Sequence, residues 1–419
     1  MRQEIGPENM KVLVFAHRLE VGGTQTNAIE LAAALRDIHG WDVVLFATPG
    51  PMLALIKEKK IRLLPAPDAL FHPAPIRMRA LREAVRKEQP DLIHVWDWWQ
   101  CLEAYYSVHL PMRIPMVVSD MMMDLTRVLP KSPPTTFGTP ELVEKARAAG
   151  RRRVALMLPP VDVHLNAPNL FDARAIRERY GLKKDEIVLV TVSRLAEEMK
   201  AESLVRTIET VRTLGHDMPI RFVIVGDGLA RERLMRIANE TNAELGRVAV
   251  LLLGPLLDPR PVYAAADVVI GMGGSALRGM AFAKPVVVVG EKNFSALMSP
   301  ETARSFYHKG IYGRGRGNPS DAGLTENIRN LIESRTSFPD LGHFSRQFVT
   351  QHFSLESVSA GLDALCRSAV TEAPSFGVSV ADGIRTAAVY LRERRFLGAS
   401  RDRRPTDWTV SLAESNSDA

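Results

Sequence analysis

The most constraining feature of this sequence is a regular alternation between short apolar runs and longer amphipathic stretches. The run KVLVFAH at residues 11–17 is typical of a buried strand. Residues 24–38 after it predict a helix with Ala28, Leu31 and Leu35 on one face. The same alternation continues to residue 160. Strands that alternate with helices form a parallel sheet with helices on both faces, so we expect a doubly wound α/β domain.

A second series of the same kind begins at residues 186–195, EIVLVTVSRL. A chain of 419 residues is also too long for one ordinary hydrophobic core. We therefore predict two Rossmann-like domains, residues 1–165 and 166–375, which face each other across a cleft. Residues 376–419 are expected to form a further helix, which can pack back on the first domain, and a polar end.

Charge and cysteine content narrow the classes of function. The net charge of +6 suits phosphorylated small molecules, nucleic acid or an anionic membrane. The basic clusters at 151–153 and 392–404 contain a single aromatic residue, Phe396, and this lack of interleaved aromatic residues argues against nucleic acid. Solvated surface is the simplest interpretation of these clusters. The only cysteines, Cys101 and Cys366, and an N-terminus without an apolar leader favour a cytoplasmic protein.

Ligands of open α/β sheets bind beyond the carboxyl ends of the strands, so the candidate site residues are sought there. Arg194 follows a predicted strand directly, and Lys200 comes six residues later. A guanidinium and an ammonium group at the mouth of a cleft suit a diphosphate. Two solvated cations are the alternative, but cations near a helix start oppose the helix dipole.

Two glycine turns also join predicted strands to helices. Gly22 and Gly23 allow the backbone to approach a ligand, although a strand-to-helix turn needs no ligand. In VGDGLARERL, Gly226 and Gly228 turn the chain and Asp227 can cap the next helix. For this second turn, a purely structural role and a ligand-binding role are equally compatible with the sequence.

The stretch GMGGSALRGMAFAKPVVVVGEK at 271–292 predicts a phosphate-binding turn. Gly274 and Ser275 precede a short helix, whose N-terminal N–H groups favour an anion. Arg278 lies on the first turns of that helix. Its side chain either contacts the ligand, belongs to a site whose function has changed, or points to solvent.

These features together resemble the GT-B glycosyltransferases, specifically the large retaining family 4. The resemblance rests on GGTQTNAIELAAAL, SRL…K, VGDG…RERL, YAAADVVI and LRGMAFAKPVVV, and covers about residues 11–370. It implies that Arg194 and Lys200 neutralise the diphosphate of a nucleotide-sugar donor. It also places Gly22 and Gly23, the 226–228 turn, and Gly274 and Ser275 near that donor.

The sequence departs from the family pattern at several positions. The family often has two glutamates where this chain has Ile270 and Arg278, and a histidine where it has Ser119–Asp120. Glu291 is a candidate for the missing carboxylate at the donor sugar. These changes keep open an alternative function, a non-catalytic protein that binds a nucleotide sugar or activates a partner.

The resemblance implies transfer of a sugar to an acceptor hydroxyl with retention of anomeric configuration. No Asp-x-Asp pair occurs, so we expect no metal and no cofactor. His17, His94 and Asp120, at strand ends of the first domain, are candidates for contact with the acceptor. The expected partners are the nucleotide sugar, a small-molecule or lipid-linked glycan acceptor, and a peripheral contact with a membrane's inner face. A dehydrogenase would need G-x-G-x-x-G after its first strand, which LEVGGTQTN lacks.

Overall fold

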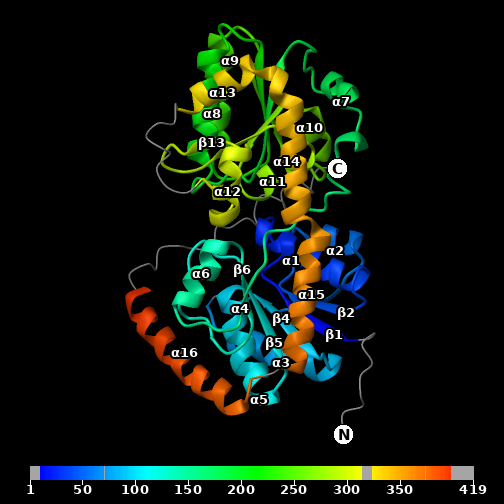
Figure 1. Cartoon of the computed structure of the whole chain (residues 1–419), viewed down its shortest axis with the longest axis vertical. Coiled ribbons are helices and arrows are strands. Elements are labelled where there is room, and N and C mark those ends of the chain that lie inside the picture. The colour runs from blue at the N-terminus through cyan, green and yellow to red at the C-terminus, as the bar shows by residue number, and fades with distance from the viewer. Residues whose placement is uncertain (1–9, 70, 314–322, 373, 398–419) are drawn as a thin grey trace, which may run out of the picture.

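The computed structural model describes residues 10–69, 71–313, 323–372 and 374–397, and it contains two α/β units, one above the other (Figure 1). The first sheet has seven parallel strands in the order β3-β2-β1-β4-β5-β6-β7. Its strands are β1 (Lys11–Phe15), β2 (Asp42–Ala47), β3 (Arg62–Pro65), β4 (Leu92–Trp96), β5 (Met116–Asp120), β6 (Thr135–Phe137) and β7 (Val154–Leu156).

The second sheet has the order β10-β9-β8-β11-β12-β13, and only β13 runs antiparallel to its neighbour. Its strands are β8 (Ile187–Val192), β9 (Ile220–Val225), β10 (Val250–Gly254), β11 (Val268–Gly271), β12 (Val286–Val289) and β13 (Ser295–Leu297). The predicted pair of doubly wound sheets is confirmed. The sequence did not predict β6 or β13, because three residues between prolines, glycines or polar residues do not form a recognisable apolar run.

Helices cover the faces of both sheets (Figure 1). The first unit contains α1 (Gly23–Asp37), α2 (Leu53–Glu58), α3 (Pro75–Glu88), α4 (Asp97–Ala104), which continues through the π-helical turn η1 (Tyr105–His109) into α5 (Leu110–Met112), and α6 (Pro140–Ala148). The second contains η2 (Pro168–Leu170), α7 (Ala173–Arg179), α8 (Ala201–Leu214), α9 (Arg231–Glu244), α10 (Arg260–Ala265), α11 (Gly274–Ala281), α12 (Pro300–Lys309), α13 (Leu324–Glu333), η3 (Arg335–Ser337) and α14 (Phe338–Phe353).

The chain crosses between the two units twice, and the two crossings are hydrogen-bonded to each other. The amide of Val161 donates to Phe353 O at 2.7 Å, and the amide of Leu355 donates to Val161 O at 2.9 Å. The second crossing leads from α14 into α15 (Leu355–Thr371), which packs against α1, β4 and β5 of the first unit. Its packing therefore assigns α15 to the first unit. From the sequence alone, the same residues are expected in the second domain, 166–375.

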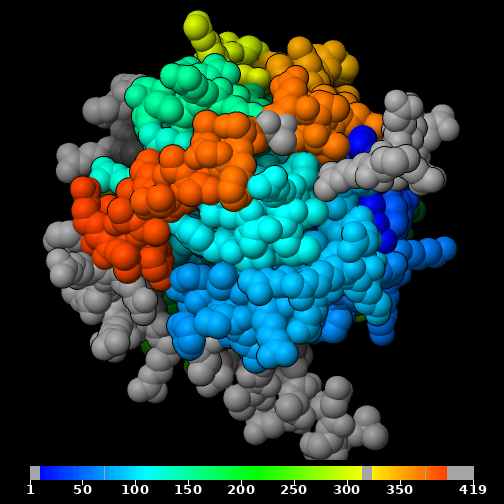
Figure 2. Space-filling view, turned by 90° about the horizontal axis from the view of Figure 1, so that it is seen from below, coloured from blue at the N-terminus to red at the C-terminus, as the bar shows by residue number. Residues whose placement is uncertain are grey.

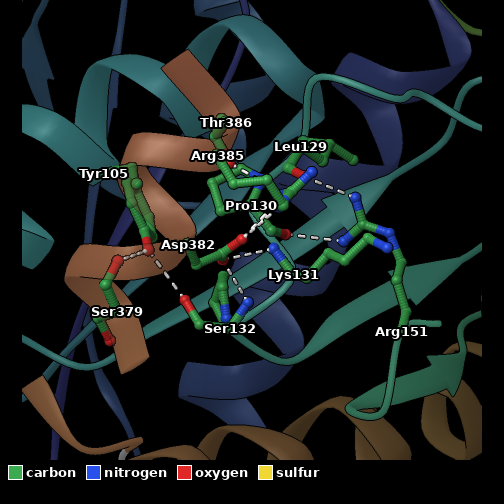
Figure 3. Close-up of polar contacts among 12 residues, drawn as sticks. Tyr105, Leu129, Pro130, Lys131, Ser132, Arg151, Ser379, Asp382, Arg385 and Thr386 are labelled. Carbon is green, nitrogen blue, oxygen red and sulfur yellow. Dashed lines mark hydrogen bonds and ion pairs between the residues drawn. The ribbon is translucent and has the colours of Figure 1, made fainter. Parts of the chain in front are cut away.

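The last described helix, α16 (Phe376–Leu397), also lies on the first unit (Figures 1 and 2). Tyr105 Oη donates to Ser379 O at 2.7 Å, and Tyr390 Oη of α16 donates to His72 O at 2.8 Å. The Asp382 carboxylate accepts hydrogen bonds from two backbone amides of the loop before β6 (Figure 3). Residues 398–419 of the expected polar end lie outside the described residues.

Candidate functional site

The loop after β8 carries both predicted cations. Arg194 is exposed and Lys200, which precedes α8, is partly buried. Among the described residues, neither side chain has a hydrogen-bond acceptor or a carboxylate partner. Burial, and then the nearby charge of Arg194, lower the pKa of Lys200 to about 8. Two adjacent cations without a counter-charge form a site that favours a polyanion.

The 226–228 turn holds this loop in place. Gly226 and Gly228 have φ values of +141° and +153°, a region that favours glycine. A Cβ atom at Gly226 would lie 1.9 Å from Ser193 O, and one at Gly228 would lie 2.4 Å from Leu195 O. The two glycines therefore let the turn pack directly against the backbone that carries Arg194, which is a structural reason for their presence.

The two acidic residues of the predicted donor site contact backbone amides. Asp227 Oδ1 accepts from the amide of Gly228 at 2.9 Å, and no described side chain caps α9, so the predicted helix cap is wrong. Glu291 Oε1 accepts from the amide of Met199 at 3.2 Å. Glu291 thus lies beside the loop that bears Lys200, at the carboxyl end of β12.

The glycine-rich turn after β11 brings the start of α11 to the same place. Gly273 has φ +55° and precedes α11, and no described side chain caps this helix N-terminus. Ser275 lies in the first helical turn and accepts a hydrogen bond from Tyr263 Oη at 3.3 Å. Lys200 and Ser275 line one small pocket together with the strand-end residue Thr191. The structure therefore brings Lys200 and the predicted phosphate-binding turn together.

Arg278 is partly buried and extends from α11 to the first unit. Its Nη2 lies 3.8 Å from Glu30 Oε1 of α1, so the pair joins the two units. Burial raises the pKa of Glu30, and the charge of Arg278 opposes this rise. Glu30 Oε2 is buried and accepts no hydrogen bond from any described residue. Sequence reasoning missed Glu30, although an acidic residue inside the apolar stretch AIELAAAL is an unusual feature.

A second group of polar side chains lies at the strand ends of the first unit. His17 Nε2 is 2.7 Å from Asp97 Oδ2, and Asp97 Oδ1 accepts from the amide of Met121 at 2.8 Å. Asp97 is buried with a left-handed backbone, φ +54°, a region that only a few per cent of non-glycine residues adopt. Because β1, β4 and β5 are neighbours, His17, Asp97 and Asp120 follow adjacent strands. Sequence reasoning missed Asp97.

Asp120 is a buried carboxyl group at the end of β5. Burial, and then the charge of Asp97, raise the pKa of Asp120 to about 7. Its Oδ2 accepts no hydrogen bond from any residue in the described ranges. A carboxyl group that titrates near neutral pH can exchange a proton with a bound hydroxyl group.

The remaining predicted residues have different surroundings. His94 is 1% exposed and its Nε2 lies 2.7 Å from Ser119 Oγ, inside the sheet. Burial lowers the pKa of His94 to about 3, so the ring is neutral. The same burial leaves almost no exposed surface of the ring for contact with an acceptor. Gly22 precedes α1 and Gly23 begins it, and no described side chain caps this N-terminus either. A Cβ atom at Gly22 would lie 2.4 Å from Gln25 Oε1.

Within residues 10–69, 71–313, 323–372 and 374–397, no group of three or more histidine, cysteine, aspartate or glutamate side chains is arranged to hold a metal ion. No helix within the same ranges combines the length and the apolar character that a membrane span needs.

Solved structures with the same two-unit fold include a glycosyltransferase from Rickettsia africae, with a TM-score of 0.66 at 13% identity over 87% of this chain and 100% of that chain. HepE from Anabaena, in complex with UDP, has a TM-score of 0.64 at 16% identity over 86% of this chain and 100% of the HepE chain. MnaA from S. aureus, bound to UDP, has a TM-score of 0.60 at 13% identity over 87% of this chain and 99% of the MnaA chain. A search of curated protein sequences gave no significant match.

Two family models match adjacent parts of the chain in the order of its two sheets. The model of glycosyltransferase family 4 matches residues 21–191, and the model of glycosyl transferases group 1 matches residues 186–309. The first match covers most of the first sheet, and the second covers the loop of Arg194 and Lys200 and the start of α11. The chain therefore belongs to the GT-B glycosyltransferases of the family 4 type.

Proposed function

We propose that this protein transfers a sugar from a UDP-sugar to an acceptor hydroxyl with retention of anomeric configuration. The observation that carries the proposal is the pair of unpartnered cations, Arg194 and Lys200, beside the uncapped N-terminus of α11. UDP is the nucleotide proposed because HepE and MnaA, which share the fold, are bound to UDP.

In the proposed reaction, the bond between the anomeric carbon and the diphosphate oxygen breaks, and a bond to the acceptor oxygen forms. Arg194, Lys200 and the N–H groups of the first turn of α11 stabilise the charge that develops on the diphosphate. The acceptor proton leaves with that diphosphate, so the enzyme needs no permanent base. Because the two cations supply the positive charge, we propose that the reaction proceeds without a metal ion.

The acceptor is proposed to bind at the strand ends of the first unit. Asp120 and the His17–Asp97 pair form a polar group there that can orient a hydroxyl by hydrogen bonding. This chemistry suits a sugar hydroxyl, either of a small molecule or of a lipid-linked glycan.

A second candidate function is binding of a nucleotide sugar without turnover. It is favoured by Ile270 and Arg278, which stand where the family often has carboxylates, and by the pairing of Arg278 with Glu30. An arginine cannot accept hydrogen bonds from ribose hydroxyls, so the nucleoside must be held differently here.

Calorimetry with UDP tests the binding site. Arg194→Ala and Lys200→Ala should each weaken binding by about 1.5–3 kcal/mol, the scale of a hydrogen bond to a charged group. Arg236→Ala, which removes an exposed cation from α9, is the matched control and should leave the affinity unchanged. Unchanged affinity in both site variants would refute the assignment.

Turnover distinguishes the two candidate functions. Slow hydrolysis of UDP-glucose in excess chelator, followed by NMR of the released sugar, should give the α-anomer first. Tight UDP binding with no hydrolysis and no transfer to any acceptor would favour the binding protein. Activity that is lost in chelator and restored by magnesium would show that the metal-free mechanism is wrong.

A further inference from the structure

The helix α16 has an unusual distribution of side chains: its polar face is buried and its apolar face is exposed. Asp382 Oδ2 accepts from the amides of Lys131 and Ser132 at 2.6 Å each. Tyr106 Oη donates to Gly383 O at 2.7 Å. Figure 3 shows the polar residues of α16 directed towards the 129–132 loop and Tyr105. Specific hydrogen bonds therefore hold α16 on the first unit.

The outer face of α16 is apolar from Val378 to Leu391. Val378, Ile384 and Leu391 are 55%, 69% and 62% exposed, and Ala381 and Ala388 are exposed between them. These residues are three or four positions apart, so they form one stripe along the helix. Figure 2 shows that α16 lies across the surface of the first unit with one side uncovered. A continuous exposed apolar stripe indicates a surface that contacts another apolar phase or molecule.

The charges beside the stripe indicate which partner it contacts. Arg113 lies over the ring of Phe376 at 4.5 Å, at the start of α16, and Arg392 is exposed next to Leu391. The sequence from 392 to 404 contains six arginines and two acidic residues. A second copy of the chain packed on the stripe would bring Arg113 and Arg392 near the same two residues of its partner. An anionic lipid surface complements both the apolar stripe and these two arginines.

A cavity lies beside the C-terminal end of the stripe. It has a volume of about 290 Å³ and is lined by Trp98, Leu125, Val128, Tyr390 and Glu393, among others. Trp99, which follows Trp98 in the chain, is 39% exposed, and its ring centroid lies 3.9 Å from that of His72. Tryptophan and tyrosine beside an apolar surface are typical of side chains that lie at the membrane–water interface.

We propose that the outer face of α16 binds the surface of an anionic lipid bilayer, with the helix lying in the plane of the interface. This inference does not depend on the glycosyl-transfer reaction. In this arrangement the hydrogen bonds of Asp382, Tyr105 and Tyr106 keep α16 attached to the first unit, so the whole first domain is held at the membrane.

The test is co-sedimentation of the full chain with vesicles. Binding to vesicles of phosphatidylcholine with about one-third phosphatidylglycerol should exceed binding to pure phosphatidylcholine, and it should weaken at high salt. Ile384→Ser with Leu391→Ser should reduce the partition coefficient by about tenfold, because two exposed apolar side chains are lost. Val248→Ser, at an exposed valine before β10, is the matched control and should bind like the unchanged chain.

Two outcomes would overturn the proposal. One is no binding of the unchanged chain to the anionic vesicles, or binding that the double substitution leaves intact. The other is a concentration-dependent dimer in analytical ultracentrifugation that the same double substitution abolishes, since this would assign the stripe to a second copy. Thermal melting and UDP calorimetry of the double variant show whether the fold and the donor site are retained.

Discussion

At the residue scale, the site is defined by ionisable groups whose surroundings change their proton affinity. Lys200 lies at the start of α8 and Asp120 at the end of β5, and burial is the main cause of the pKa shift of each. Burial disfavours the charged form, so it lowers the pKa of the lysine and raises that of the aspartate. A pKa shift caused by burial, in a group that has no oppositely charged partner, is more typical of a functional site than of a structural ion pair.

Asp120 gives a prediction about stability and pH. Its pKa is raised from 3.8 to about 7 in the folded chain, so the folded state binds more protons than the unfolded state between these values. Its contribution to the free energy of unfolding therefore decreases as pH rises from about 4 to about 7. Asp120→Asn should flatten this part of the melting temperature profile, whereas Asp124→Asn, at an exposed site, should not. Identical slopes for the unchanged chain and Asp120→Asn would contradict the assignment.

At the scale of elements, α16 depends on a few hydrogen bonds rather than on an apolar core contact. Asp382 is central, because it accepts from two loop amides and also pairs with Arg385 at 2.9 Å (Figure 3). Asp382 therefore holds the middle of the helix, beside the hydrogen bonds made at Ser379, Gly383 and Tyr390, and the loop before β6 depends on the same carboxylate.

Asp382→Ala leaves the amides of Lys131 and Ser132 without their acceptor. Each unsatisfied group costs about 1–3 kcal/mol, so α16 should detach more readily from the first unit. Hydrogen exchange measured by mass spectrometry should become faster in residues 376–397 and in the 129–132 loop. Ala381→Ser, on the outer face of the same helix, should change neither segment. Unaltered exchange in Asp382→Ala would mean that other contacts hold the helix.

At the scale of the whole molecule, the two units are joined by paired chain crossings and by contacts across the space between them. The crossings are fixed by the hydrogen bonds between Val161 and the 353–355 segment. His308 Nε2 of α12 lies 3.1 Å from Glu144 Oε2 of α6, and Arg278 pairs with Glu30. These side-chain contacts can form only when the two units are close, so they stabilise this relative arrangement.

A double-mutant cycle measures the coupling between Arg278 and Glu30. Arg278→Ala removes the cation that pairs with the partly buried Glu30, so this variant should be less stable than Glu30→Gln. The double variant should recover part of the loss, with an interaction free energy of about 1 kcal/mol, since the pair is partly exposed and 3.8 Å apart. The measurement is thermal and urea unfolding of all four proteins. Additive effects within about 0.3 kcal/mol would show that the pair does not couple the units.

The sequence by itself determined the architecture, because hydrophobic periodicity is a local property. The runs at 11–17 and 186–195 contain β1 and β8, and the alternation that follows each run gives most strands and helices of its sheet. Periodicity did not predict α12 and α14, where aromatic and polar residues interrupt the apolar pattern, or short strands such as β6. It also could not show that α15 returns to the first sheet, since a helix pattern does not specify which surface covers it.

Within the site, the sequence identified groups that can be recognised from their residue type and from their position after a predicted strand. Arg194, Lys200 and the 274–275 turn are of this kind, and they lie together. Only the tertiary structure decided the roles that depend on distance: it paired Arg278 with Glu30, and it buried His94 inside the sheet. It also placed Asp97 between His17 and Asp120. The physical reason is that burial and electrostatic pairing depend on atoms that are distant in the chain and adjacent only after folding.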